Sequence, residues 1–107
     1  MLCSYQTFGP VVDAEIRALP PDMQARLLRL AELIVQSGLH ALPRESVKHL
    51  EGKLWEFRIS GRDGIARAIY VTASMRRVVV LRVFVKKAQR TPVRELEIAR
   101  QRAKEVI

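Results

Sequence analysis

Apolar residues recur at helical spacing in the first part of the chain and alternate with polar residues later on. Residues 10–18 predict a short helix, and residues 20–37 predict a longer one with Leu27 and Ile34 on its inner face. Two prolines favour the start of the longer helix, because proline fits the first helical position, and a glycine follows its expected end. Residues 39–46 show no period and predict a loop.

Three β-strands are predicted next, the first from a period of two, the second from its β-branched and aromatic residues, and the third from an apolar run that suits a central strand. They cover residues 54–60, 65–73 and 78–85, and short segments rich in glycine, aspartate, serine and arginine join them. Trp55 shares one side of the first strand with two other apolar residues, so we expect it in the core. Successive strands with such short connections favour an antiparallel meander.

A last helix is predicted after Thr91, which can cap it, with Pro92 in its first turn. Its expected inward positions are Val93, Leu96, Ala99, Ala103 and Ile107. The order of elements predicts an α+β fold, in which N-terminal helices pack on one face of a small antiparallel sheet and a C-terminal helix follows. We expect residues 1–107 to form a single domain, since the chain shows no linker or repeat.

Side chains alternate across a strand, so parity sorts them onto two faces. In the third strand we assign one set to the core beneath the helices: Val79, Leu81, Val83 and Val85. The opposite set then shares an outer face with polar residues of the other strands: Glu56, Arg58, Arg67, Arg82, Phe84 and, just beyond, Lys86. Such a face suits RNA, because guanidiniums bind phosphates and an aromatic ring stacks on a base. An ordinary solvated surface fits the same pattern.

The positive charge is concentrated in the second half of the chain. Residues 1–51 contain 5 Lys/Arg and 6 Asp/Glu, whereas residues 52–107 contain 14 and 5. With a pI of about 10.6, nucleic acid is the first expected partner. No apolar run is long enough to span a membrane, and the single Cys3 forms neither an internal disulfide nor a zinc site. We expect a cytoplasmic protein without membrane association or structural metal.

Three motifs resemble the RelE/HigB toxins of bacterial toxin–antitoxin modules, and most closely their phage-derived HigB-like branch. They are Leu54-Trp-Glu-Phe-Arg58, Gly64-Ile-Ala-Arg67-Ala-Ile-Tyr70 and Phe84-Val-Lys-Lys-Ala-Gln-Arg-Thr-Pro92. The likeness extends from about Val11 to the end of the chain. It implies a small antiparallel sheet with helices packed on one side. It also implies an endoribonuclease that cleaves messenger RNA, usually on translating ribosomes, without metal or cofactor.

The resemblance also implies roles for particular residues. Arg67 matches the arginine that contacts the scissile phosphate, Lys86 and Lys87 match the basic pair that closes the last strand, and Arg58 matches the arginine that ends the first sheet motif. The chain departs from the family at Ala66, where many relatives have tyrosine. It also has no tyrosine after Tyr70, whereas better-studied members have a catalytic tyrosine in or near the last helix.

The residues themselves allow a metal-free mechanism in which the RNA 2′-hydroxyl attacks the neighbouring phosphate. Arg67 is the candidate for stabilising charge on that phosphate. Lys86 or Lys87 can transfer a proton or simply attract phosphate, and Glu56 is an alternative base. Further candidate RNA contacts are Arg82, Phe84, Arg90 and Arg94, although the last two also fit a solvated helix face. His49 is a weaker candidate for catalysis.

Partners follow from the same resemblance. It implies messenger RNA, the ribosome and a cognate helix-turn-helix (HigA-like) antitoxin, with operator DNA contacted only through that antitoxin. Two rival functions remain open at this point. The related ParE toxins share the fold and inhibit DNA gyrase without catalysis, and a plain RNA-binding module would never cut.

Overall fold

A five-stranded sheet with the strand order β1-β5-β4-β3-β2 organises the protein. The computed structural model describes residues 3–73, 76–87 and 89–106. Its strands are β1 (Ser4–Thr7), β2 (Val47–Glu51), β3 (Leu54–Gly61), β4 (Gly64–Ala73) and β5 (Arg77–Val85); its helices are α1 (Pro10–Arg17), α2 (Pro21–Ser37) and α3 (Val93–Ala103). All neighbouring strands are antiparallel except β1 and β5, which are parallel. The predicted α+β class is confirmed.

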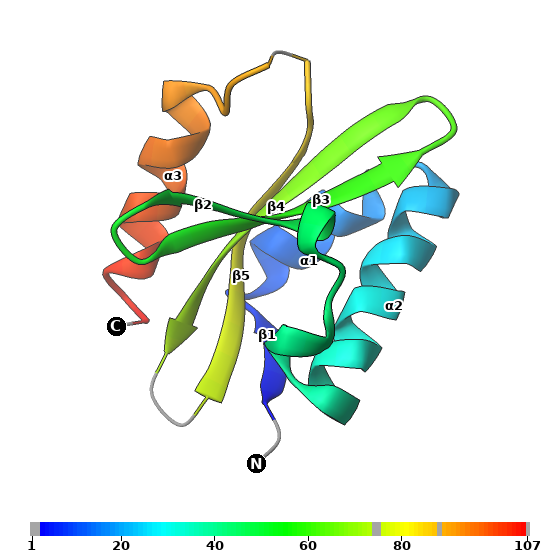
Figure 1. Cartoon of the computed structure of the whole chain (residues 1–107). Helices are drawn as coiled ribbons and strands as arrows, with labels where there is room; N and C mark the ends of the chain where they lie inside the picture. Colours follow the sequence, from blue (N-terminus) through cyan, green and yellow to red (C-terminus); the bar gives the residue numbers. More distant parts are fainter. Residues whose placement is uncertain (1–2, 74–75, 88, 107) are drawn as a thin grey trace.

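Helices α1 and α2 cover one face of the sheet (Figure 1). The apolar side of α2 packs on β3 and β4, where Ala66 and Ala68 leave room for close approach. The helices contribute Val12, Leu19, Met23, Leu27, Leu30 and Ile34 to this core, and the strands contribute Phe57, Ile59, Ala66, Ala68, Tyr70, Val78, Val80 and Val83. The predicted inner face of the long helix is therefore confirmed.

Helix α3 packs on the opposite face of the sheet, so helices do not lie on one side alone (Figure 1). Its Ala99 and Ala103 are buried against Ile69, Val71 and other apolar strand residues, which form a second core. Part of the face that was expected to be open is therefore covered by α3. The hollow at Lys86 and Lys87 lies outside this covered part.

A β-bulge in β5 changes which residues face which layer. Ile69 pairs with Arg82 but Tyr70 pairs with Val80, so Leu81 has no register partner on β4. Because an extra residue reverses the alternation, Val79 and Leu81 face α3, whereas Val83 faces α1 and α2. The prediction of one uniform core set in this strand was wrong. The bulge nevertheless leaves Arg82 and Phe84 on the same face as Arg67.

Two edge strands and the last helix differ from the sequence prediction. β1 and β2 were not predicted, and residues 39–46 contain two short 3-10 turns, Leu39–Ala41 and Arg44–Ser46. Helix α3 begins at Val93, which is exposed, and Thr91 does not cap it. The expected inward position Ile107 lies outside the described residues. Within the described ranges, no helix combines the length and apolarity needed to cross a membrane.

Trp55 is exposed rather than part of the core. Its side chain is 38% exposed, and its ring lies 4.8 Å from the ring of His49, centroid to centroid, on the neighbouring edge strand. The His49 Nε2 lies 2.8 Å from the carbonyl oxygen of Gly52. Trp55 has the parity of a core residue, but it is not among the residues packed against α1 and α2. The prediction of a buried Trp55 was therefore wrong.

Gly61 lets the start of α2 approach the β3–β4 turn closely. A Cβ at Gly61 would lie 2.7 Å from Met23 Cγ and 2.9 Å from Asp22 Oδ2. The backbone amide of Arg62 donates a 2.6 Å hydrogen bond to Asp22 Oδ2, which is the main reason that the pKa of Asp22 is lowered. Helix α2 and the hairpin are thereby fixed to each other at this point.

Gly61→Ala should lower the free energy of unfolding by about 1–3 kcal/mol, because the added methyl group overpacks Met23. Denaturant unfolding followed by circular dichroism measures this change. Gly9→Ala is the matched control, since nothing lies within 4 Å of a Cβ at that position; it should shift stability by less than about 0.5 kcal/mol. Equal stability of the two variants would contradict the close approach at Gly61.

Candidate functional site

The predicted polar face exists, and the register of three strands assembles it. Arg58 on β3 pairs with Arg67 on β4, which in turn pairs with Phe84 on β5. In the next row on the same face, Glu56 pairs with Ile69, which pairs with Arg82. Because residues in register lie on the same side of a sheet, all five polar or aromatic residues predicted on these three strands share one face.

Arg67 is buried rather than exposed on this face. Its side chain is 2% exposed, and that of Glu56 is fully buried beside it. The Arg67 Nη1 lies 2.9 Å from Glu56 Oε2 and 3.3 Å from Oε1. Removing one member of a buried ion pair is strongly destabilising, because it leaves the other charge buried without a counter-charge. The pair is therefore a fixed feature of the fold.

The segment before α3 covers the Glu56–Arg67 pair. Arg67 Nη1 donates to the Thr91 hydroxyl at 2.7 Å, and Arg67 Nη2 donates to the Gln89 carbonyl at 3.0 Å. The Thr91 hydroxyl in turn donates to Glu56 Oε1 at 2.9 Å. This explains why Thr91 does not cap α3: its hydroxyl is used between the two charged groups. The buried Arg67 Nε makes no hydrogen bond within the described residues.

Lys86 lies at the end of β5, beside the buried pair. Its backbone amide donates to the Ile65 carbonyl at 2.7 Å, which fixes its position against β4. The pKa of its ammonium group is lowered, first by loss of solvation and then by the positive charges of Arg67 and Arg58. A lowered pKa increases the share of neutral amine near neutral pH, which is what a general base requires.

An open hollow of about 500 Å³ lies next to Lys86, and Lys87 also lines it. Its remaining lining residues are Gly64, Ile65 and Gln89. Gln89 is also the residue whose carbonyl binds Arg67. The hollow therefore adjoins both the lysine pair and the cover over Arg67.

Lys48 belongs to this cationic face, although the sequence analysis did not find it. It pairs with Glu56 across β2 and β3, its side chain is exposed, and its charge also lowers the pKa of Lys86. The segment Val47-Lys-His-Leu-Glu51 gives little strand signal, because its two apolar residues stand three positions apart and do not alternate with polar ones.

Arg82 and Phe84 lie on the predicted face but are engaged within the protein. Arg82 forms ion pairs with Glu15 of α1 at 2.7 Å and with Glu95 of α3 at 2.6 Å. Glu15 also accepts from Arg102, so the network ties α1, β5 and α3 together. Phe84 is partly buried against the core beneath α3. Neither side chain is presented to solvent as the sequence pattern had suggested.

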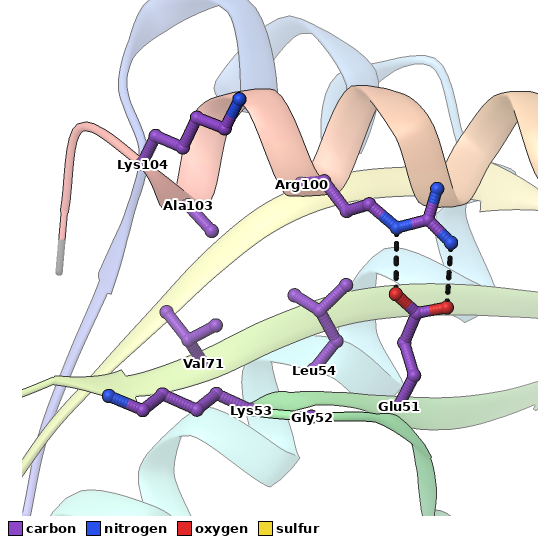
Figure 2. Close-up of a pocket in the computed structure, with 8 residues that line it drawn as sticks. All are labelled: Glu51, Gly52, Lys53, Leu54, Val71, Arg100, Ala103 and Lys104. Carbon is purple, nitrogen blue, oxygen red and sulfur yellow. Dashed lines mark hydrogen bonds and ion pairs between the residues drawn. The ribbon is translucent and has the colours of Figure 1, made fainter.

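The remaining predicted candidates lie outside this cluster. Arg90 and Arg94 are exposed, the first before α3 and the second on its outer surface. Figure 2 shows a separate groove between α3 and the β2–β3 turn, lined by Leu54, Val71 and Ala103 and flanked by Lys53 and Lys104. Arg100 and Glu51 form a bidentate ion pair at 2.7 Å beside this groove.

These features describe a small basic α+β protein with cations clustered around a buried Glu–Arg pair. The chain belongs to the family described as "Phage derived protein Gp49-like (DUF891)", which matches residues 14–104. This family is one of RelE/HigB-like toxins of toxin–antitoxin type, and such a toxin implies an antitoxin partner. Comparison with curated proteins gave no match.

Proposed function

We propose that this protein is a toxin that cleaves messenger RNA, on translating ribosomes, and thereby inhibits translation. The observation that carries the proposal is the grouping of Lys48, Arg58 and Lys86 around the buried Glu56–Arg67 pair. Positive charges grouped in this way repel one another, and an anionic ligand offsets that repulsion. A phosphodiester of single-stranded RNA provides that charge.

The proposed reaction is transesterification within the RNA. The 2′-hydroxyl oxygen bonds to the adjacent phosphorus, the bond from phosphorus to the 5′-oxygen breaks, and the products are a 2′,3′-cyclic phosphate and a free 5′-hydroxyl. The base that takes the 2′-proton is neutral Lys86 in this proposal, and the leaving 5′-oxygen takes its proton from water. Glu56 is less suited to that role, because its carboxylate is fully buried and held by Arg67 and Thr91.

Arg67 has a conditional role in this mechanism. Its Nη atoms already bind Gln89 and Thr91, so direct contact with the phosphate requires the RNA to replace these two bonds. Arg58, partly exposed and in register with Arg67, contacts the phosphate without such a change. Lys87 is exposed at the hollow and attracts the flanking strand.

Primer extension on cellular messages after brief expression tests the proposal. We expect discrete cleavage sites in translated regions, with 5′-hydroxyl ends, and none when translation is blocked beforehand. The matched control is expression of Lys86→Ala at equal protein level. Intact messages with altered plasmid supercoiling would instead indicate gyrase inhibition, and bound but uncut RNA would indicate a binding module.

The partners proposed for this toxin follow from its family. We propose a helix-turn-helix antitoxin that neutralises it and contacts operator DNA, so that the toxin touches DNA only through that partner. We also propose that residues 1–107 act as one domain.

A further inference from the structure

A second group of cations faces a hollow at the edge of the sheet where α2 packs on β3. Arg26 and Arg29 from α2 and Arg58 from β3 line this hollow, whose volume is about 350 Å³. Two serines, Ser46 and Ser60, complete its polar lining together with Glu45. Strand β2 begins at Val47, opposite Phe57, so Arg58 has no register partner on β2, and the turn Arg44–Ser46 lies against β3 beyond this point.

The three guanidiniums have no ionic partner in the part of the chain that the structure describes. Glu45 also lines the hollow, but within the described residues it forms no ion pair with any of these three arginines. Three like charges around one hollow repel one another, which disfavours the folded state. A loss of stability of this kind is typical of ligand-binding surfaces.

The hollow is held in shape by its neighbours. Helix α2 is fixed to the β3–β4 turn by the Asp22–Arg62 hydrogen bond and by the close approach at Gly61. Arg26 lies one helical turn after Asp22, and Arg29 follows on the same side. The backbones of Arg26 and Arg29 are thereby held beside β3, and their exposed guanidiniums can bind phosphate oxygens in pairs of hydrogen bonds.

We propose that Arg26, Arg29 and Arg58 form a phosphate subsite for the RNA strand that flanks the cleaved linkage. This inference rests on the proposed function. Arg58 belongs to both sites, because its charge acts on Lys86 while it also lines the hollow. In this proposal the RNA strand passes from Lys86 over Arg58 to the hollow between β3, α2 and the turn Arg44–Ser46. Serine hydroxyls donate further hydrogen bonds to phosphate oxygens.

The test compares two double variants that each remove two positive charges. Arg26→Gln/Arg29→Gln changes the proposed subsite, and Lys53→Gln/Lys104→Gln changes the distant groove of Figure 2. The probe is an uncleavable 2′-O-methyl RNA of about twelve nucleotides, within the usual site sizes for single strands. Its Kd is measured over a range of salt concentrations, and thermal unfolding confirms that both variants are folded.

We expect the arginine variant to bind at least about tenfold more weakly at 0.1 M salt. Its salt slope should fall by about 1.4, because each phosphate contact to a single strand contributes about 0.7. The lysine variant should keep the wild-type slope, and Arg26→Lys/Arg29→Lys should recover part of the affinity. Equal binding by the arginine and lysine variants would overturn the subsite.

Cleavage in a translating extract separates failure of the subsite from failure of the proposed function. If the wild type cleaves messages and the arginine variant cleaves them equally well, the subsite is wrong and the function stands. If the wild type does not cleave, the proposed function is wrong, and the oligonucleotide binding still decides whether the hollow takes RNA. Loss of antitoxin binding alone in the arginine variant would assign the hollow to a protein and overturn the proposal.

Discussion

Lys86→Ala is expected to lower the rate of RNA cleavage by about 10²–10⁴, the range for removal of a general acid or base. The pKa of Lys86 is lowered by loss of solvation and by the charges of Arg67 and Arg58, so more of its amine is neutral at a given pH than in an ordinary lysine. Lys86→Arg should be nearly as inactive, because a guanidinium keeps the positive charge but does not lose its proton. Single-turnover cleavage of a defined message on ribosomes measures these rates.

The pH dependence of cleavage should have a definite sign. Neutral lysine is the reactive form, so the rate should rise with pH until it levels off at the lowered pKa of Lys86. Lys87→Ala is the comparison variant, and we expect it chiefly to weaken RNA binding. An active Lys86→Arg variant with an unchanged pH profile would show that Lys86 acts by charge attraction alone.

Arg67→Ala is expected to destabilise the fold by about 3–5 kcal/mol, because it leaves the buried Glu56 carboxylate without a counter-charge. It also removes the bonds that hold Gln89 and Thr91 over the sheet. The sequence alone suggests the opposite, a folded and inactive variant, because parity places Arg67 on an open face. Denaturant unfolding gives the free energy, and hydrogen exchange at residues 89–91 reports the loss of the cover.

A double variant separates the structural role of Arg67 from its chemical role. Glu56→Leu/Arg67→Met replaces the buried pair by apolar side chains, which is often neutral for stability. We expect it to be clearly more stable than Arg67→Ala and yet to cleave RNA about 10²–10³ times more slowly than the wild type, the usual effect of losing one oxyanion donor. Wild-type cleavage by a folded double variant would remove Arg67 and Glu56 from the mechanism.

The pKa of Lys86 connects the Lys86 variants with the Arg67 variants. Loss of the positive charge of Arg67 should raise the pKa of Lys86, since that charge is one cause of its lowering. The double variant also removes Glu56, whose charge acts in the opposite direction. The rising limb of the pH profile should therefore move less in the double variant than in Arg67→Ala, in which the opposing charge of Glu56 is retained.

The sequence by itself determined the fold class, α2 and the strands β3, β4 and β5. Helix α2 and β3 show regular apolar periods, β4 and β5 are rich in β-branched residues, and the glycine-containing turn from Ser60 to Gly64 leaves few alternatives. It also determined which residues of β3 and β4 share the polar face, because parity holds wherever a strand is regular. The register of Arg58 with Arg67 follows from the same hairpin.

Only the tertiary structure decided how that face is used. The bulge at Leu81 reversed the parity within β5, and no local pattern distinguishes such a bulge from a regular apolar strand. The segment before α3 covers Arg67, and the Thr91 hydroxyl in this segment binds Glu56 instead of capping the helix. Short edge strands such as β2 bury few apolar residues and therefore show a weak sequence pattern. The sequence for this reason did not predict Lys48 at the site. These features depend on contacts between distant segments of the chain, and no short stretch of sequence contains both partners of such a contact.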